Sequence, residues 1–545
     1  MELITANGIS LDFGAEPLLN RASLRILAQD RIGLVGPNGA GKTSLLKLLT
    51  RTDGLAPTQG SLTTMPGLRL GYAPQIPDTS GLATVEDLIL RELRPFQHRL
   101  AEAEHTLAEG DPDRMDALLA RYQEAMDRFE QAGGYHALDA GLAALDRLGC
   151  RLPPHRRLDS LSGGQLSLLG IAAAVIHKPH LLILDEPGNH LDFRGLSWLE
   201  GFLTNYPGAV LMVSHNRYLL DSVCTRIWHL QGGEFAAFTG SYTAFRADLA
   251  RQRADREHEF RIQDRRARDL EQRVKQLRSV ASSQYNPPAQ VLAKLSAAKR
   301  KLSQAQETRG TRPVQDHGLG LELKAHQTSR ADIAIQGTNL DLEIAGLMLL
   351  RDANFLISSG ERVGIVGPNG CGKTTLLTKI MEQGSWDNPV LRIGPSMTLG
   401  YLSQIPVFNR PQGTIMDEIR SWGPLTMDQA FDLAKPFLFS YRDMDKPLGV
   451  LSGGEQNRLQ FARLMYSGAN LLILDEPTNH MDIPSRESIE AALDGFTGTL
   501  VTVSHDRYFL DGVVSRILAF YGDELIDHPG GFSSWFDQWG ELYHD

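Results

Sequence analysis

An internal repeat is the feature that most constrains how this chain of 545 residues folds. Residues 36–43 (GPNGAGKT) recur as residues 367–374 (GPNGCGKT), and residues 181–187 (LLILDEP) recur unchanged as residues 471–477. An LSGG motif lies between them in each copy, and its serine precedes the aspartate of LLILDEP by 23 positions both times. A histidine follows that aspartate after 30 positions, again in both copies. Equal intervals between several motifs indicate two copies of one domain.

The repeat divides the chain into three parts. We place the first domain at about residues 1–240, the second at about residues 331–545, and a linker at residues 241–330. The first domain is longer, and its extra residues fall at about residues 89–132, where apolar residues recur at helical spacing on both sides of a Gly-Asp-Pro-Asp turn signal. We therefore expect a helical arm there. The alternative is an enlarged helical subdomain that contacts no partner.

Each Gly-rich motif follows an apolar run and precedes a helical pattern, which is the context that a phosphate-binding P-loop needs. Glycines let backbone N–H groups surround phosphate oxygens, and the helix N-terminus adds its dipole. Lys42 and Lys373 would reach the β and γ phosphates, and the hydroxyls of Thr43 and Thr374 would bind Mg²⁺. The candidate ATP-binding residues of the two loops are Gly36, Asn38, Gly39, Gly41, Lys42, Thr43 and Ser44, and Gly367, Asn369, Gly370, Gly372, Lys373, Thr374 and Thr375.

Two Asp-Glu pairs follow the continuous apolar runs, which are typical of strands buried on both faces of a parallel sheet. Charged residues just beyond such a strand lie at the carboxyl edge of the sheet, where α/β proteins bind ligands. Asp185 and Asp475 would therefore hold the metal, and Glu186 and Glu476 would polarise the attacking water. The alternative is that each pair only caps a helix.

His215 and His505 each follow a short strand-like run. A histidine in such a place is often a core or capping residue. Here the matched distance from each Asp-Glu pair favours contact with the γ phosphate instead.

The motifs and their order resemble those of the ATP-binding cassette (ABC) ATPases: a P-loop, a glutamine, an LSGGQ-type signature, an Asp-Glu pair and a histidine. The resemblance implies two tandem α/β P-loop NTPase domains, each with a helical subdomain, that pair head to tail around two ATP molecules. It also implies that Gln75 and Gln404 act as Mg²⁺ ligands and in catalysis. Implied site one comprises Lys42, Thr43, Gln75, Asp185, Glu186 and His215 with Ser452, Gly453 and Gly454. Implied site two comprises Lys373, Thr374, Gln404, Asp475, Glu476 and His505 with Ser162, Gly163 and Gly164.

Residues 477–482 (PTNHMD) and 504–510 (SHDRYFL) narrow the resemblance to the ABC-F subfamily, in which two cassettes are fused without a membrane span. ABC-F proteins act on ribosomes, as translation factors or as antibiotic-resistance proteins. The resemblance therefore implies an ATP-hydrolysing enzyme in which ATP closes the two cassettes and positions the linker.

The first copy departs from the second at several motif positions. Gly188 and Asn216 replace a threonine and an aspartate, and residues 166–168 (LSL) replace residues 456–458 (QNR). Phe13 could stack on adenine, where the second copy has Ile344 at the matching position. All the catalytic carboxylates are present, so we expect two competent sites with unequal rates.

The linker differs in charge from the rest of the chain. The whole chain carries a net charge of −10, but residues 241–330 hold 19 basic and 10 acidic residues. Apolar residues at helical spacing on both sides of a breaker at residues 282–288 predict an α-helical hairpin. The basic excess is concentrated at residues 273–312 and predicts contact with RNA phosphates, in rRNA or tRNA of a ribosome. The alternative is a solvated helix whose charges pair with one another.

Composition limits the remaining choices. Three cysteines form no disulfide framework, the N-terminus lacks a basic secretion signal, and no apolar run is long enough to span a bilayer. We therefore expect a cytoplasmic protein, and a monomer because the two cassettes can pair with each other. Two other classes stay open: the energy-coupling ATPase subunit of a transporter with a separate membrane partner, and a clamp that binds ATP with little turnover.

Overall fold

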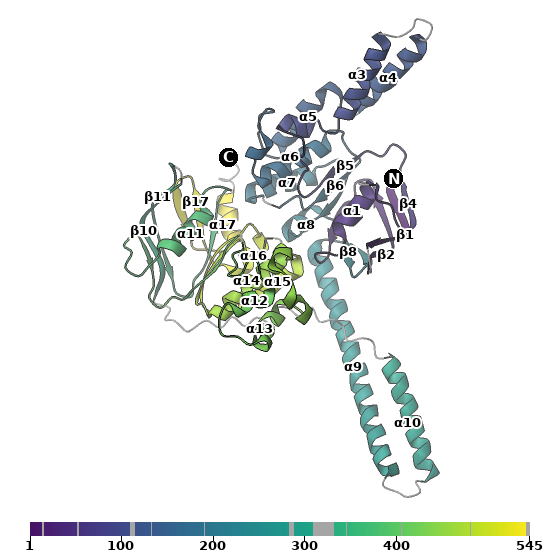
Figure 1. Ribbon diagram of the computed structural model, residues 1–545, viewed down its shortest axis with the longest axis vertical. Helices are drawn as coiled ribbons and strands as arrows, with labels where there is room; N and C mark the ends of the chain where they lie inside the picture. Colours follow the sequence, from purple (N-terminus) through teal and green to yellow (C-terminus); the bar gives the residue numbers. More distant parts are fainter. Residues whose placement is uncertain are drawn as a thin grey trace. The chain divides into compact units, whose positions relative to one another are not determined.

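The computed structural model describes residues 1–13, 16–51, 54–108, 115–131, 133–189, 191–282, 288–308, 332–344, 346–404, 406–479 and 481–540. The chain forms two compact units. One contains Met1–Tyr242 together with His317–Asp545, and the other is Thr243–Asp316 (Figure 1).

The first cassette is built on two sheets. An antiparallel sheet has the order β2-β1-β4, and a six-stranded sheet has the order β5-β6-β7-β3-β8-β9. All neighbours in the second sheet are parallel except β8 and β9. The strands are β1 (Glu2–Phe13), β2 (Glu16–Leu27), β3 (Arg31–Val35), β4 (Gln59–Thr64), β5 (Leu70–Ala73), β6 (Leu181–Asp185), β7 (Ala209–Val213), β8 (Arg226–Gln231) and β9 (Glu234–Thr239). Every residue of β6 and β7 is buried, which explains their continuous apolar sequences.

Eight helices of the first cassette lie within the described residues. They are α1 (Lys42–Thr50), α2 (Val85–Ile89), α3 (Arg94–Ala108), α4 (Met115–Gln131), α5 (Ala137–Arg147), α6 (Gly163–Val175), α7 (Phe193–Thr204) and α8 (Arg217–Val223). The segment expected to form an arm contains α3 and α4, which pack on each other (Figure 1). The turn signal at residues 110–113 lies outside the described residues, and the boundaries of the arm stay a prediction.

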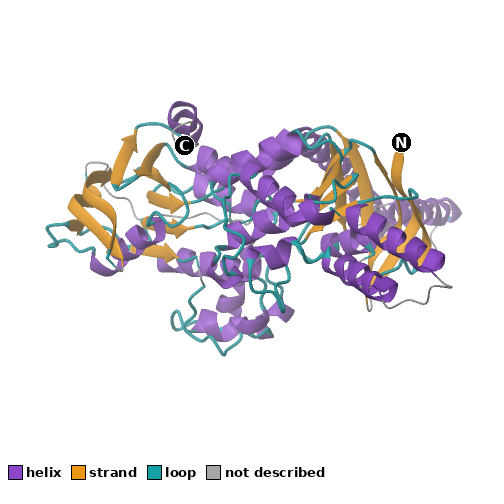
Figure 2. Ribbon diagram, turned by 90° about the horizontal axis from the view of Figure 1, so that it is seen from above, coloured by secondary structure: helices purple, strands orange, loops and turns teal. Residues whose placement is uncertain are grey.

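The second cassette repeats the same topology. Its sheets have the orders β11-β10-β13 and β14-β15-β16-β12-β17-β18. The strands are β10 (Ile333–Ile344), β11 (Leu347–Ser358), β12 (Arg362–Val366), β13 (Leu391–Ile393), β14 (Leu399–Leu402), β15 (Leu471–Asp475), β16 (Thr499–Val503), β17 (Arg516–Tyr521) and β18 (Glu524–His528). The helices are α11 (Lys373–Gln383), α12 (Ile415–Arg420), α13 (Met427–Ala434), α14 (Gly453–Ser467), α15 (Ile483–Asp494), α16 (Arg507–Val513) and α17 (Phe532–Trp539). Figure 2 shows strands and helices by colour.

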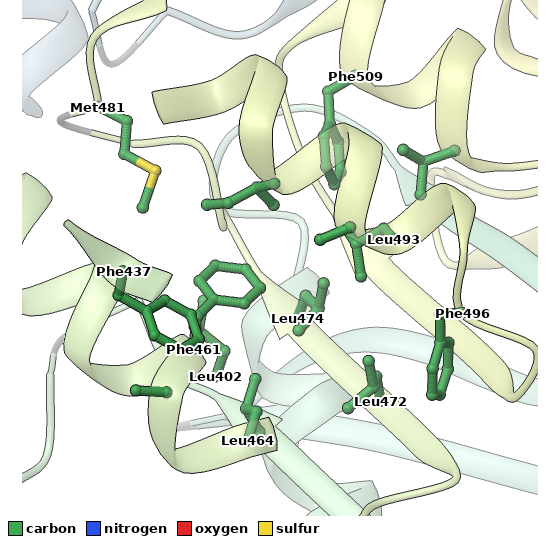
Figure 3. Packing of buried hydrophobic residues seen from close by; sticks show 14 of the residues in the cluster. Leu402, Phe437, Phe461, Leu464, Leu472, Leu474, Met481, Leu493, Phe496 and Phe509 are labelled. Carbon is green, nitrogen blue, oxygen red and sulfur yellow. The ribbon is translucent and has the colours of Figure 1, made fainter. Parts of the chain in front are cut away.

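The core of the second cassette joins its helical subdomain to its central sheet. Figure 3 shows part of this cluster: Phe437 and Phe461 lie near Leu402, and Leu472 and Leu474 belong to the same core. The strand side chains come from β14 and β15, so the core fixes the carboxyl ends of the strands that precede Gln404 and Asp475.

The second unit consists mainly of α9 (Tyr242–Ser282) and α10 (Ala289–Thr308), drawn beside each other in Figure 1. Ala267 of α9 and Ala298 of α10 are buried. The predicted breaker lies mostly outside the described residues, and the linker boundaries of 241–330 stay a prediction. Among the described residues, none of the helices combines the length and apolar character needed to cross a membrane.

Candidate functional site

The two Gly-rich loops connect a buried strand to a helix in each cassette. Gly41 and Gly372 precede α1 and α11 with φ of 92° and 107°, a left-handed conformation that favours glycine. A Cβ atom at Gly372 would lie 2.9 Å from Leu349, so a larger residue would also crowd the adjoining sheet. The loops therefore present backbone N–H groups at a helix N-terminus, which suits an anion.

The loop lysines are held by their own loops. The Lys42 ammonium donates hydrogen bonds to the carbonyl oxygens of Gly36 (2.9 Å) and Pro37 (3.1 Å). Lys373 makes the equivalent contacts with Gly367 (2.9 Å) and Pro368 (2.8 Å). Burial lowers the pKa of Lys42. A nucleotide phosphate would offer both cations a negatively charged partner.

A glutamate and a histidine face each other at the ends of neighbouring strands. The backbone N–H of His215 donates to Oε2 of Glu186 (3.1 Å), and its Nε2 lies 3.3 Å from Oε1. In the second cassette the corresponding distances between His505 and Glu476 are 3.2 and 3.5 Å. Both glutamates have positive φ, 51° and 50°. Such a backbone is unfavourable for glutamate, and strained residues of this kind cluster at functional sites.

Burial determines the protonation of these pairs. It raises the pKa of Glu186 to about 7 and that of Glu476 to about 8. It lowers the pKa of His505 to about 3 and that of His215 well below its usual value. The histidines are therefore neutral at pH 7, and a carboxyl with a pKa near 7 suits a group that exchanges protons with water.

The remaining carboxylates suit a divalent cation. Thr43 donates its hydroxyl proton to Oδ2 of Asp185 (2.8 Å). Within the described part of the chain, both carboxylate oxygens of Asp475 are buried without a hydrogen-bond partner. Carboxylate and hydroxyl oxygens are ligands that Mg²⁺ accepts, so the residues fit this ion.

One cavity of about 510 Å³ lies between the two cassettes and gathers the residues expected at site two. It is lined by the P-loop of the second cassette, the signature of the first, and the catalytic groups. Of the residues predicted from the sequence for site two, those that line the cavity are Ser162, Gly163, Gly164, Asn369, Gly370, Gly372, Lys373, Thr374, Thr375, Gln404, Asp475, Glu476 and His505. The cavity also contains Ile344, the counterpart of Phe13. The side chain of Phe13 itself lies outside the described residues.

The signature serines begin helices. Ser162 accepts a hydrogen bond from the backbone N–H of Gln165 (3.2 Å), and Ser452 accepts one from that of Glu455 (3.3 Å). Each serine therefore caps the N-terminus of its helix, α6 or α14, and the two glycines that follow it are the first residues of that helix. Gln75 is exposed and lies two residues after β5.

Two aspartates that sequence reasoning missed reach across to the opposite cassette. Oδ2 of Asp192 accepts a hydrogen bond from the backbone N–H of Asn369, and Oδ2 of Asp482 accepts one from that of Asn38, both at 3.1 Å. The other oxygen of each aspartate caps its own helix, α7 or α15. Each aspartate follows the aspartate of its Asp-Glu pair by seven positions, and this shared interval was the available signal.

The expected difference between the copies has a structural counterpart. Asn457 donates its side-chain N–H to the carbonyl oxygen of Asn479 (2.9 Å), linking the signature helix to the loop after the Asp-Glu pair. Ser167 holds this position in the first cassette, and its side chain is too short to make the same contact.

Comparison with known proteins places the chain among ABC proteins. The sequence family described as ABC transporter matches residues 19–189 and 350–479. The chain is 32% identical to the energy-dependent translational throttle protein EttA of Mycobacterium tuberculosis (strain H37Rv) over 527 residues, 94% of this chain and 90% of EttA. It is 31% identical to the ATP-binding protein Uup of Escherichia coli (strain K12) over 547 residues, 98% of this chain and 82% of Uup.

Solved structures support the fold. The RNase-L inhibitor is similar with a TM-score of 0.61 and 19% identity, covering 99% of this chain and 92% of that one. An archaeal ABCE1 chain gives a TM-score of 0.61 at 18% identity, covering 98% of this chain and 92% of that one. The predicted fold class, two tandem P-loop cassettes of α/β type, is confirmed.

Proposed function

Since the chain belongs to the ABC-F subfamily of ATP-binding cassette ATPases and is an ATP-hydrolysing enzyme, we propose that its ATPase cycle acts on the ribosome during translation. The relative EttA is named for an energy-dependent effect on translation. The observation in this chain that carries the proposal is the charge of the helical hairpin.

Basic residues gather in the C-terminal part of α9 and in α10. Residues 272–282 and 288–304 contain no acidic residue. The basic residues there, all exposed, are Arg273, Lys275, Arg278, Lys294, Lys299, Arg300 and Lys301. A surface of one charge sign on paired helices suits a polyanion such as rRNA or tRNA.

The N-terminal part of α9 has the opposite character. Residues 243–271 hold eight basic and seven acidic residues. Arg261 pairs with Glu257 (2.7 Å), and Arg268 pairs with Asp264 (2.8 Å), both at i,i+4 spacing. This part fits a solvated helix whose charges pair with one another. The two parts of one helix thus provide a test region and an internal control.

The ATP sites supply the energy for this cycle in our proposal. ATP lies between the P-loop of one cassette and the signature of the other, so that binding draws the cassettes together and positions linker 241–330. The threonine, aspartate and glutamine of each site would hold Mg²⁺, which would neutralise phosphate charge. Glu186 and Glu476 orient the attacking water and accept its proton. His215 and His505, which are neutral, donate a hydrogen bond to the γ phosphate.

The proposal is tested with the double variant Glu186→Gln, Glu476→Gln, which should bind ATP and stay closed. It should sediment with 70S ribosomes in ATP and not in ADP. Adding Arg273→Gln, Lys275→Gln and Arg278→Gln should weaken the binding. It should also reduce the slope of log affinity against log salt by about 2 to 3, since each phosphate contact contributes about 0.7 to 0.9.

A matched control removes three exposed arginines from the balanced part of the same helix: Arg251→Gln, Arg256→Gln and Arg265→Gln. This variant should keep nearly full ribosome affinity. An equal loss of ribosome affinity in both triple variants would mean that net charge, and not the position of the basic residues, determines binding. Absence of ATP-dependent sedimentation at low salt would refute the ribosome proposal, and recovery with a membrane protein would favour a transporter subunit. Release of ribosome-bound antibiotics by the same complexes would separate a resistance protein from a translation factor.

A further inference from the structure

Arg486 makes a contact that joins the two ATP sites. This residue lies in α15 of the second cassette, and its side chain is buried. Its Nη1 donates to the backbone carbonyl oxygen of His215, which belongs to the first cassette (3.1 Å). Arg486 also lines the cavity of site two. A single guanidinium therefore touches the histidine loop of site one while it borders site two.

The same guanidinium is fixed on its own side. Nη1 also donates to Oδ2 of Asp506 (3.1 Å), the residue that follows His505, and Nε donates to the carbonyl oxygen of Met481 (3.0 Å). Arginine holds such a fork geometry rigidly, and hydrogen bonds to an ionised partner are stronger than neutral ones. The chain of contacts runs from the histidine loop of site two through Asp506 and Arg486 to the histidine loop of site one.

The matching half of the interface lacks the residues for such a link. Leu196 occupies the position equivalent to Arg486, and Asn216 occupies the position equivalent to Asp506. Leucine cannot donate a hydrogen bond. The link is therefore a property of one side of the pair, and it does not follow from the repeat.

We propose that Arg486 is a positioning residue for site one: from the opposite cassette, it holds the carbonyl oxygen of His215 and so orients the imidazole toward the γ phosphate. Because Asp506 anchors the same guanidinium beside His505, movement of the histidine loop at site two reaches site one. The inference rests on the proposed role of His215 and is independent of ribosome binding.

The test measures each site separately. In the Glu476→Gln background site one hydrolyses ATP, and in the Glu186→Gln background site two does. Single-turnover hydrolysis of radiolabelled ATP gives the rate constant and apparent ATP affinity of the remaining site. Arg486→Leu, which installs the residue of the first cassette, should lower the rate at site one about tenfold, with little change in affinity. The rate at site two should change less than threefold.

A matched control is Glu490→Gln. Glu490 of the second cassette pairs across the interface with Arg217, and this pair involves neither Arg486 nor the carbonyl oxygen of His215. If this ion pair affects only closure of the cassettes, the variant should raise the ATP concentration needed for half-maximal hydrolysis at both sites. Both rate constants should stay nearly unchanged. Arg486→Lys keeps a cationic hydrogen-bond donor at this position. Its rate at site one should therefore stay within about threefold of the parent.

Several outcomes would overturn the inference. They are an equal loss of rate at both sites in Arg486→Leu, no loss at site one, or the same pattern in Glu490→Gln. If Arg486→Leu does not fold, Asp506→Asn replaces it. Asn216 already caps the matching helix of the first cassette, so this substitution keeps the cap and removes the carboxylate that anchors Arg486 and that also lies 3.7 Å from Arg217. A parent that hydrolyses no ATP at site one would refute the role of His215 and, with it, this inference.

Discussion

The ion pair between Arg217 and Glu490 should contribute measurably to closure of the cassettes. Nη1 of Arg217, in α8, lies 2.9 Å from Oε2 of Glu490, in α15, and Nη2 contacts the other carboxylate oxygen. Arg217 also lies 3.7 Å from Asp506 and over the ring of Tyr508. The side chains of the pair are only 8% and 21% exposed, so water screens them weakly.

These values set the magnitude. Exposed ion pairs contribute about 0.2 to 1 kcal/mol, and loss of one partner from a buried pair costs about 3 to 5 kcal/mol. A two-pronged pair with one partner a fifth exposed falls between these limits, at about 2 kcal/mol. Since about 1.4 kcal/mol corresponds to a tenfold change, the closed state should become about 30-fold less populated relative to the open state.

A double-mutant cycle measures this value. Arg217→Met, Glu490→Gln and their combination are made in the Glu186→Gln, Glu476→Gln background, and retention of radiolabelled ATP reports closure. Each single change should weaken retention about 30-fold, and the combination should be no worse than either one. Additive losses would refute the reasoning, because they would show that the two side chains act independently. So would full retention in both single variants.

Three further predictions concern the sites themselves. Glu186→Gln and Glu476→Gln should lower steady-state ATPase by unequal amounts, since the copies differ at Gly188 and Asn216; equal losses would contradict unequal sites. Because burial raises the pKa of both glutamates, to about 7 and about 8, folding favours their protonated forms, and the resulting stability is lost as pH rises through those values. The nucleotide-free double Gln variant should therefore exceed the parent in Tm at pH 8.5, and this advantage should shrink as pH falls through 8 and 7 and vanish near pH 4.5, the usual glutamate pKa. The Phe193 ring packs on that of His505, with ring centroids 5.4 Å apart. Phe193→Ile, which installs the residue of the second copy, should therefore lower the unfolding free energy by about 1 to 2 kcal/mol and slow hydrolysis at site two alone. Equal slowing at site one would contradict this prediction.

Sequence reasoning succeeded where chemistry requires a residue type at a fixed place in one local element. A strand buried on both faces must be apolar throughout, so β6 and β15 could be predicted from LLIL followed by Asp-Glu. A P-loop needs glycine at left-handed positions such as Gly41 and a lysine directly after it. These requirements hold within one cassette, whatever the other cassette does.

The contacts between cassettes could not be predicted in this way. Asp192 and Asp482 had matching intervals, but a helix cap explains an aspartate there just as well. Arg486 sits in a helix at a position where the first copy has leucine, so the repeat itself points away from it. Which side chain meets which loop depends on how the two folded cassettes pair, and motif spacing along the chain does not record that geometry.

The two halves of the cassette interface share an arginine–tyrosine contact but differ in their ion pairs. Arg217 lies over the ring of Tyr508 (5.0 Å) and also faces the carboxylates of Glu490 and Asp506. The counterpart of Arg217 is Arg507, whose guanidinium lies over the rings of Tyr218 (4.1 Å) and Phe536 (4.3 Å). Because a two-pronged ion pair joins the arginine–tyrosine contact around Arg217, the two halves should contribute unequally to closure. Unequal sites are therefore expected from the interface as well as from the substituted motifs.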